Sequence, residues 1–324
     1  MSSASLTDRF RLPLGGRRIP PVAVLALVVV LAVGAVVAWR IGLRLTHVTR
    51  LEAVPPNSTL PVPAESPIVV VMLENKTEAQ IHDAADAPYL QHLLASGAEM
   101  TDYQGVAHPS QPNYLALFSG STQGVFDDHV HDVDAPTLAD QLEAAGKTWR
   151  IFAENYPGGC FTGASATGGP DGDGTYVRKH VPAISFRSIA GSPTRCANIQ
   201  PLASFEPDAA DFMWIVPNLC HDMHDCPIAS GDRWLASFVP RILDSPAFRP
   251  GGHGLLIVTF DERDGNDHNG EIVTVLVGPD VRAGTTSGIA HSHYSLLRTI
   301  ETSLGLPCLA DACEANTLGE AFGR

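Results

Sequence analysis

The sequence predicts an α/β domain in which helices cover both faces of a mainly parallel sheet, preceded by one transmembrane helix. Short apolar runs alternate with helical segments after residue 67. This alternation is typical of parallel strands that are buried on both faces. Residues 20–39 carry no charge and are long enough to cross a bilayer as one helix. A chain of 324 residues suffices for one large domain or two modest ones.

Arginines flank the uncharged segment on both sides, with a small excess before it. They are Arg9, Arg11, Arg17 and Arg18 on one side and Arg40, Arg44 and Arg50 on the other. We therefore expect residues 1–50 to form a cytoplasmic tail and a single-pass anchor in the cell membrane. The rest of the chain would then lie outside the cytoplasm. A cleaved signal peptide is the alternative, although the apolar stretch is long for one.

The segment that follows reads as a linker and then as one folded domain. Residues 51–66 are rich in proline and small polar residues, which favours a semi-rigid linker. Within residues 67–324 we expect strands at 68–73, 147–153, 212–216, 255–260 and 272–277, and helices at 89–96, 137–145, 233–243 and 294–304. The glycine-rich residues 158–175 predict a long loop. About 155–210 we expect an insertion that forms a lid.

Charge is distributed unevenly along the chain. Residues 1–50 hold seven of the 21 basic residues but only one of the 35 acidic ones, so the remainder has 14 basic against 34 acidic residues. Nucleic-acid binders usually show a basic stripe, and none is visible, so we expect no nucleic-acid partner. An anionic substrate would need its charge met locally, which a bound cation can do.

Polar side chains follow three of the predicted strands. Glu74 and Asn75 follow the first, Asp261 and Glu262 follow the strand at 255–260, and Asn218, His221 and Asp222 follow the strand at 212–216. Ligands of open α/β sheets bind beyond the carboxyl ends of the strands, and adjacent acids repel unless something neutralises them. Carboxylate and amide oxygens suit hard divalent cations, and histidine suits zinc or manganese. The alternatives are solvated loop acids, with Asn75 as a helix cap.

The stretch HPSQPNYLALFSG, residues 108–120, places Ser110 where a helix should begin. Pro112 fits the first turn and Gly120 the end of that helix. An ordinary helix cap is the alternative for this serine. The same position offers free N–H groups to a phosphate, and a serine whose pKa is lowered by a metal is a competent nucleophile. His293 opens the final helix, either as a surface histidine or facing the same cleft.

Five motifs together resemble the bacterial and fungal phosphoesterase family, which holds acid phosphatases and phosphatidylcholine-type phospholipases C with an alkaline-phosphatase-like core. They are VVVMLENKT, HPSQPNYLALFSG, TFDERDG, VLVGPDVRAGT and HSHYSLLRTIETSLGLP. They cover most of residues 67–307 in the family's order. The resemblance implies a fold with a central sheet and a metal-dependent phosphoesterase activity.

The resemblance also implies a role for individual residues. Glu74 with Asn75 and Asp261 with Glu262 would be metal-binding pairs, Ser110 would be both nucleophile and metal ligand, and Asp222 would be a further ligand. His221 or His293 would protonate the leaving alcohol. His108 lies near the serine and would be a supporting group. The stretch DERDGNDHNG, residues 261–270, departs from the family's pattern after the acidic pair, and His268 there either supports the site or belongs to a solvated loop. The cofactor would be a divalent metal ion: zinc, manganese, magnesium or calcium.

The reaction that follows is hydrolysis of small phosphomonoesters through a phosphoserine. A phospholipase C acting on phosphatidylcholine-type lipids is the alternative within the same chemistry. A serine hydrolase for carboxyl esters would need the G-x-S-x-G elbow, which Ser110 lacks. A cation-dependent binding module on the cell surface would fit the acidity and the anchor, but it would not need Ser110.

Six cysteines, with two close pairs, suggest disulfides in an oxidising compartment. We expect Cys220 with Cys226 and Cys308 with Cys313, which leaves Cys160 with Cys196 by elimination. Free buried thiols are one alternative. A zinc site in the stretch CHDMHDC, residues 220–226, is the other.

Overall fold

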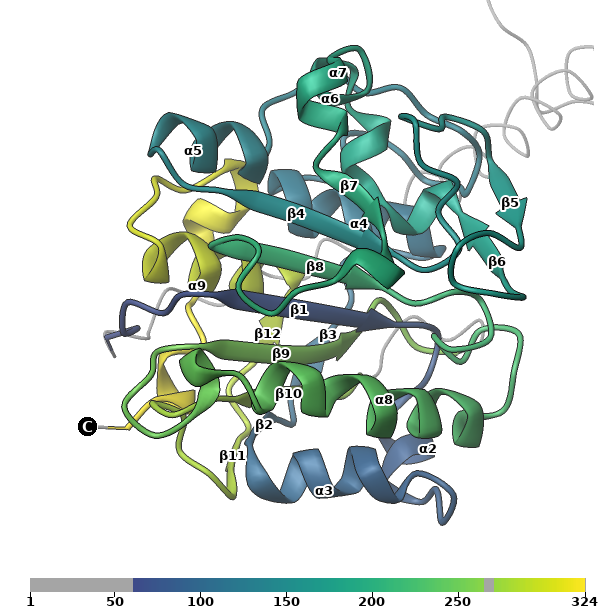
Figure 1. Ribbon diagram of the computed structural model, residues 1–324. Helices are drawn as coiled ribbons and strands as arrows, with labels where there is room; N and C mark the ends of the chain where they lie inside the picture. Colours follow the sequence, from purple (N-terminus) through teal and green to yellow (C-terminus); the bar gives the residue numbers. More distant parts are fainter. Residues whose placement is uncertain (1–60, 265–270, 324) are drawn as a thin grey trace, which may run out of the picture. The chain divides into compact units, whose positions relative to one another are not determined.

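The computed structural model describes residues 61–264 and 271–323 (Figure 1). The expected cytoplasmic tail, the anchor at 20–39 and most of the linker lie outside these residues. Within the described part of the chain, no helix is both long and apolar enough to span a bilayer. The anchor therefore stays a prediction from sequence.

An eight-stranded sheet forms the centre of the domain, in the order β11-β2-β10-β9-β1-β8-β4-β7. Five neighbouring strands are parallel: β9 (Leu255–Phe260), β1 (Ile68–Leu73), β8 (Phe212–Val216), β4 (Trp149–Ala153) and β7 (Ile199–Pro201). The other three strands are β10 (Thr274–Val277), β2 (Ala98–Met100) and β11 (Thr285–Ser287). Only β10 runs antiparallel to its neighbours, so the predicted mainly parallel α/β sheet is confirmed.

The central strand β1 sets the register of its neighbours. All six of its residues are buried, because the sheet is covered on both faces. Ile68 lies opposite both Phe212 of β8 and Leu255 of β9, and Leu73 lies opposite Phe260. The carboxyl ends of these strands therefore meet at one edge of the sheet.

Helices cover the two faces of the sheet, as predicted (Figure 1). On one face α3 (Pro88–Ser96) packs against α8 (Ile228–Leu243), and on the other α4 (Ser110–Ser119) packs against α9 (His293–Ser303). The remaining α-helices are α2 (Glu78–His82), α5 (Leu138–Ala144), α6 (Arg187–Ala190) and α7 (Pro193–Cys196). Helix α8 begins at Ile228 rather than at the predicted 233, since small residues there conceal the apolar pattern. Gly231 in that first part allows close packing, because a Cβ atom would lie 2.4 Å from the Met223 side chain.

The segment 155–210, expected to be a lid, contributes to the sheet and to the core. Its strand β7 pairs with β4, and Ile184, Phe186 and Phe205 are almost fully buried. The predicted long loop at 158–175 instead carries part of a hairpin between β5 (Ser165–Thr167) and β6 (Thr175–Val177). These strands are too short to produce a visible alternation of apolar and polar residues.

The remaining short elements connect the sheet and its helices. A two-stranded ladder joins β3 (Tyr103–Gln104) to β12 (His291–Ser292). The 3₁₀ helices are η2 (Arg178–His180), η3 (Pro182–Ser185), η4 (Leu202–Ser204), η5 (Pro246–Phe248), η6 (Ala310–Glu314) and η7 (Gly319–Ala321).

All six cysteines form disulfides, in the three expected pairs: Cys160–Cys196, Cys220–Cys226 and Cys308–Cys313. Free thiols and a zinc site at 220–226 are thereby excluded. The bridge between Cys220 and Cys226 closes the loop that carries His221 and Asp222.

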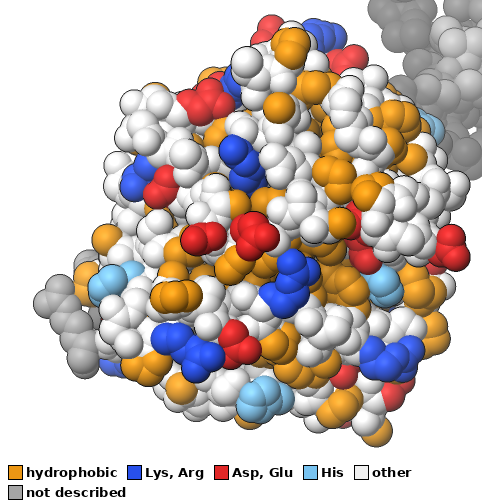
Figure 2. Space-filling view, in the orientation of Figure 1, with side chains coloured by type: hydrophobic (Ala, Val, Ile, Leu, Met, Phe, Trp, Pro, Cys, Tyr) orange, Lys and Arg blue, Asp and Glu red, His pale blue; other side chains and the backbone are white. Residues whose placement is uncertain are grey.

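The molecular face drawn in Figure 2 mixes acidic, basic and apolar side chains. Lysine and arginine side chains are scattered among aspartate and glutamate there and do not form a continuous stripe. The expected lack of a nucleic-acid partner stays a prediction.

Candidate active site

The two predicted metal-binding pairs meet where β1 and β9 end. Glu74 follows β1 and Asp261 follows β9, and the parallel register brings them side by side. The backbone N–H of Asn75 donates to Asp261 Oδ1 over 3.1 Å. Asn75 has a φ of 50°, a left-handed conformation that asparagine tolerates better than most residues. Thr77 caps the helix that follows, so Asn75 as a helix cap was the wrong alternative.

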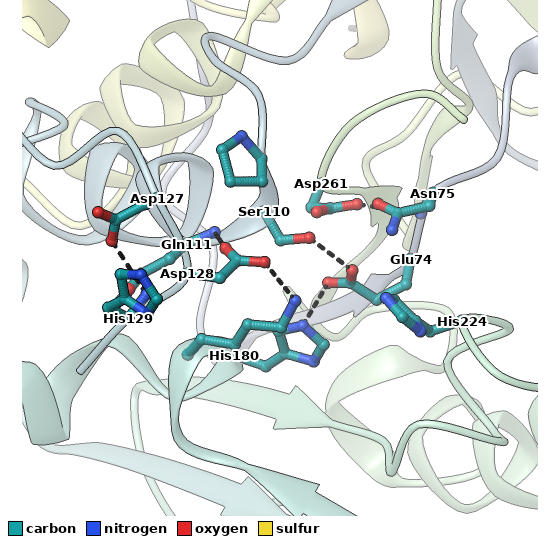
Figure 3. Close-up of polar contacts among 12 residues, drawn as sticks. Glu74, Asn75, Ser110, Gln111, Asp127, Asp128, His129, His180, His224 and Asp261 are labelled. Atoms are coloured by element: carbon teal, nitrogen blue, oxygen red, sulfur yellow. Dashed lines mark hydrogen bonds and ion pairs between the residues drawn. The ribbon is translucent and has the colours of Figure 1, made fainter. Parts of the chain in front are cut away.

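Ser110 is the first residue of α4, and its hydroxyl points at the Glu74 carboxylate (Figure 3) and also lies near Glu262. Its Oγ lies 3.0 Å from Glu74 Oε2 and 3.3 Å from Glu262 Oε1. Pro109 occupies the cap position, and the Ser110 side chain makes no cap hydrogen bond. The helix-cap interpretation of this serine is therefore wrong, and its hydroxyl is instead aimed at buried acids.

A buried histidine that the sequence did not indicate lies between Glu74 and Asp222. His180 Nε2 lies 3.2 Å from Glu74 Oε1, and its Nδ1 lies 3.4 Å from Asp222 Oδ2. Its ring stacks on Tyr114, whose hydroxyl donates to Glu74. Burial lowers the pKa of His180 well below its usual value, so the ring is neutral near pH 7. His180 is the one histidine of residues 155–210, and no motif around it marked it as a site residue.

Of the two histidines expected to support the site, His108 and His268, the structure describes only His108. His108 Nδ1 contacts Glu262 Oε2, which agrees with its predicted place behind the serine. His268 lies outside the described residues. Two further charged groups, Asp128 and Lys179, lie at the N-terminus of α4. Asp128 accepts a hydrogen bond from the Gln111 N–H over 3.0 Å and pairs with Lys179 Nζ at 2.7 Å (Figure 3).

The two expected proton donors differ in their surroundings. His293 is fully buried, donates from Nε2 to the Asp261 carbonyl over 2.6 Å, and lies 3.0 Å from the Tyr103 hydroxyl through Nδ1. Burial lowers its pKa to about 4. Because both ring nitrogens are engaged and the ring is neutral, hence a very weak acid, near pH 7, His293 does not fit the predicted donor role. His221 is a third exposed and holds Glu154 through Nδ1 at 2.9 Å.

Glu154 is a site residue that the sequence did signal. It follows β4 as Glu74 follows β1, and both are succeeded by asparagine, in FAEN and MLEN. Both asparagines adopt positive φ angles, 50° at Asn75 and 60° at Asn155. Glu154 accepts from the backbone N–H of Asn218 over 3.0 Å, so the ends of β4 and β8 are joined.

Four acids at this edge repel one another. Burial, and then the charge of Asp261, raises the pKa of Glu262 to about 10, and burial raises that of Asp261 to about 6. Burial together with neighbouring carboxylates also raises the pKa of Glu74 and of Asp222 well above the usual range. Such mutual repulsion is relieved when a cation binds.

The site fits a divalent cation by a second criterion. Asn75 Oδ1 and Asp261 Oδ2 are buried without a hydrogen-bond partner among the described residues. Buried oxygens are nearly always paired in native proteins, so each such case calls for a ligand or a water. Carboxylate and amide oxygens together form the donor set that hard divalent ions prefer.

We expect the metal-free chain to lose stability as pH rises from about 5 to 9. The folded-state pKa values of Asp261 and Glu262 are raised, so the folded chain holds protons that the unfolded chain has released. Between the unfolded and the folded pKa of each group, the unfolding free energy therefore falls by at most about 1.4 kcal/mol per pH unit. Above the folded pKa, the contribution of that group to stability is lost.

Denaturant unfolding in the presence of a chelator measures this effect. The unfolding midpoint should be higher at pH 5 than at pH 8, and a saturating divalent ion should flatten the difference. In the variant Glu262→Gln the pH dependence should be weaker. A midpoint that rises between pH 5 and pH 8 without metal would contradict the electrostatic description of the site.

Comparison with known proteins supports the family resemblance. The Phosphoesterase family model matches residues 69–307. The phosphatidylinositol-3-phosphatase of Mycobacterium tuberculosis is 35% identical over 264 residues, covering 81% of this chain and 84% of that protein. The acid phosphatase of Aspergillus fumigatus is 32% identical, covering 76% of this chain and 57% of that protein. The chain spans 57% to 62% of the length of its fungal relatives.

A solved structure agrees with the expected core. A protein of the alkaline phosphatase superfamily from Vibrio parahaemolyticus matches with a TM-score of 0.50 and 12% identity, covering 80% of this chain and 75% of that one. At that identity the likeness concerns the fold alone. The family match spans the strands and helices that carry Glu74, Ser110 and Asp261. The chain therefore belongs to the Phosphoesterase family and is a hydrolase that acts on phosphoric ester bonds.

Proposed function

We propose that this enzyme hydrolyses phosphomonoesters through a phosphoserine formed on Ser110, with the help of divalent metal ions. The observation that carries the proposal is the position of Ser110 Oγ, buried at the start of α4 and 3.0 Å and 3.3 Å from Glu74 and Glu262. A hydroxyl between two carboxylates has proton acceptors at hand, and a helix N-terminus favours an anion.

The proposed metal-holding groups are Ser110 together with the carboxyl and amide side chains at the same strand ends. They are Glu74, Asn75, Ser110, Asp222, Asp261 and Glu262. A bound divalent ion would polarise phosphoryl oxygens and lower the pKa of the serine hydroxyl. The identity and number of the ions are left to experiment, among zinc, manganese, magnesium and calcium.

The chemistry proposed for the chain's own residues has two halves. Ser110 Oγ would attack phosphorus as Glu74 or Glu262, kept ionised when a cation is bound, accepts its proton; the bond from Oγ to phosphorus forms and the ester bond to the alcohol oxygen breaks. Water then attacks the phosphoserine and releases inorganic phosphate. His180, neutral and buried, lies between the Glu74 and Asp222 carboxyl groups, with its Nε2 3.2 Å from Glu74 Oε1.

The phosphate group itself would meet Lys179 and the first N–H groups of α4. Asp128 now contacts both, as an anion placed between the Gln111 N–H and Lys179 Nζ (Figure 3). A phosphoryl oxygen has the same charge sign and acceptor chemistry, so we propose that substrate takes the place of the Asp128 carboxylate. His221 is the proposed proton donor to the departing alcohol. Its Nδ1 is held by Glu154, so its Nε2 is the nitrogen that would deliver the proton.

A lipid-borne phosphomonoester is the second candidate substrate. Phe126 is 79% exposed and Val130 is 50% exposed, and both lie in the same loop as Asp128. Exposed apolar side chains beside a polar site suit contact with lipid. The relative from Mycobacterium tuberculosis is named for phosphatidylinositol 3-phosphate, which carries a monoester phosphate on a lipid. The structure gives no corresponding support for the diester cleavage of a phospholipase C.

We also propose an extracytoplasmic catalytic domain of residues 67–324, anchored by residues 20–39. Three disulfides support this proposal, because such bonds persist in oxidising compartments. The buried hydroxyl of Ser110 argues against a cation-dependent binding module, because such a module does not need a nucleophile.

We expect release of phosphate from a chromogenic phosphomonoester and from phosphatidylinositol 3-phosphate, but no release of phosphocholine from phosphatidylcholine. A chelator should abolish the release, and added divalent ions should restore it. Hydrolysis of phosphatidylcholine alone would replace the proposal with a phospholipase C. A metal-loaded chain that turns over none of the three substrates would instead favour the binding module.

A further inference from the structure

A second acidic group lies at the opposite edge of the sheet from Ser110. Glu65 comes before β1, His253 comes before β9, and Asp280 follows the end of β10. Ile68 of β1 pairs with Leu255 of β9, so residues 65 and 253 approach the sheet side by side. Val277 of the antiparallel β10 pairs with Leu256, which returns Asp280 to the same edge. A strand of six residues spans about 20 Å, so this cluster is remote from the active site.

Glu65 is buried in an unusual way for a carboxylate. It is 2% exposed, and neither of its side-chain oxygens has a hydrogen-bond partner among the described residues. Its backbone is fixed, since its own N–H donates to Ser303 Oγ and the next N–H donates to the His253 carbonyl. A buried, unpaired carboxylate held on a fixed backbone is costly unless a partner satisfies it.

The partners within reach of Glu65 form a ligand set. One ligand atom each from Glu65, His253 and Asp280 lies within 4.8 Å of the other two. Ligand atoms on one tetrahedral zinc ion are about 3.4 Å apart, because each lies about 2.1 Å from the metal. His253 Nδ1 and Asp280 Oδ2 already lie 2.8 Å apart, and these side chains are 65% and 36% exposed, so both have freedom to adjust to that spacing around an ion. With two carboxylates and one imidazole, the set neutralises a divalent ion.

The surroundings leave room for the remaining coordination positions. His253 and Asp280 line an open cavity of about 430 Å³, together with Phe248, Val277 and Pro279. Water from that side would complete the coordination of an ion. Burial and the nearby Asp280 also raise the pKa of Glu65 to about 7, as expected for an acid that lacks a cation.

We propose that Glu65, His253 and Asp280 form a second, structural site for a divalent cation such as zinc. A mixed set of imidazole and carboxylate ligands suits zinc better than magnesium or calcium. An ion there ties the segment that enters the domain to the residues before β9 and to the turn after β10. Its role is to fasten the N-terminal end of the domain, and it takes no part in ester hydrolysis.

Zinc binding to the metal-stripped, full-length chain at pH 8 tests this site. His253→Ala should bind one zinc equivalent fewer than wild type, and Glu65→Gln, which keeps the buried volume, should do the same. Alanine at the exposed His92 of α3 is the matched control and should bind as wild type does. Phosphatase activity of His253→Ala should stay within twofold of wild type, because the site is remote from Ser110.

Two further readouts locate the ion. Zinc should slow amide hydrogen exchange over residues 61–67 in wild type but not in His253→Ala. Anomalous scattering at the zinc edge should place an ion between Glu65 and His253. Equal zinc stoichiometry and affinity in wild type and both variants would overturn the proposal, as would loss of the zinc equivalent together with activity, since the missing ion would then be the catalytic one.

Discussion

Replacing Ser110 by alanine should lower phosphatase turnover by at least about 1,000-fold, because the variant lacks the atom proposed to bond to phosphorus. The Ser110 hydroxyl faces Glu74 and Glu262 and caps no helix, so its removal should leave the fold intact. Steady-state kinetics on a chromogenic phosphomonoester and a denaturant unfolding curve measure the two effects. Acid-quenched wild type should also carry phosphate on a peptide that contains residue 110.

Ser119→Ala is the matched control for that variant. Ser119 is also buried in α4, but its hydroxyl donates to the Leu115 carbonyl at the other end of the helix. Its loss should leave turnover within a few fold of wild type. Full activity in Ser110→Ala would remove this serine as the nucleophile, and a phosphorylated peptide elsewhere in the chain would name its replacement.

Replacing Glu74 by glutamine should separate activity from stability. We expect turnover to fall by at least about 100-fold, because one of the proposed metal-holding carboxylates and a proton acceptor of Ser110 are lost together. In metal-free protein at pH 8, the same change should raise the unfolding free energy by about 1 kcal/mol, since burial and the charges of Asp261 and Asp222 disfavour a charged Glu74. Activity assays and unfolding with a chelator present measure the pair.

Glu301→Gln provides the comparison for Glu74→Gln. Glu301 is another buried acid whose pKa is raised by burial, to about 7, but it pairs with Gln141 and the Leu309 N–H away from Ser110. Its replacement should leave turnover near the wild-type value. If Glu74→Gln were as active as wild type, the metal-holding role of that carboxylate would be excluded.

Much of the architecture could be predicted because its signals are local. The strands at 68–73, 212–216 and 255–260 match the structure, since uninterrupted apolar runs are distinctive of strands buried on both faces. The order of such strands in a parallel sheet then makes the polar residues after them neighbours. Glu74, Asn75, Asp261 and Glu262 could be expected to meet for that reason, and Cys220 with Cys226 because of their short spacing.

Other features depend on contacts between distant residues, which a single sequence does not display. His180 reaches Glu74 only because the segment 155–210 folds back under α4, and no periodicity marks that path. The proton-donor role of His293 followed from its match to the family's histidine before the last helix, but its contacts with Asp261 and Tyr103 depend on the folded chain. Glu154 could have been predicted as a site residue, since FAEN repeats the MLEN pattern at a second strand end.

The position of β1 at the centre of the sheet has a consequence for synthesis of the protein. A ribosome releases the IVVVML strand early, but both strands that pair with it, β8 and β9, begin only at residues 212 and 255. During most of translation this apolar segment therefore has no native neighbour, and such segments aggregate readily. A nascent chain that stops before residue 261 also lacks Asp261 and Glu262, two of the proposed metal-holding acids, so we expect the enzyme to be inert until most of the chain has emerged.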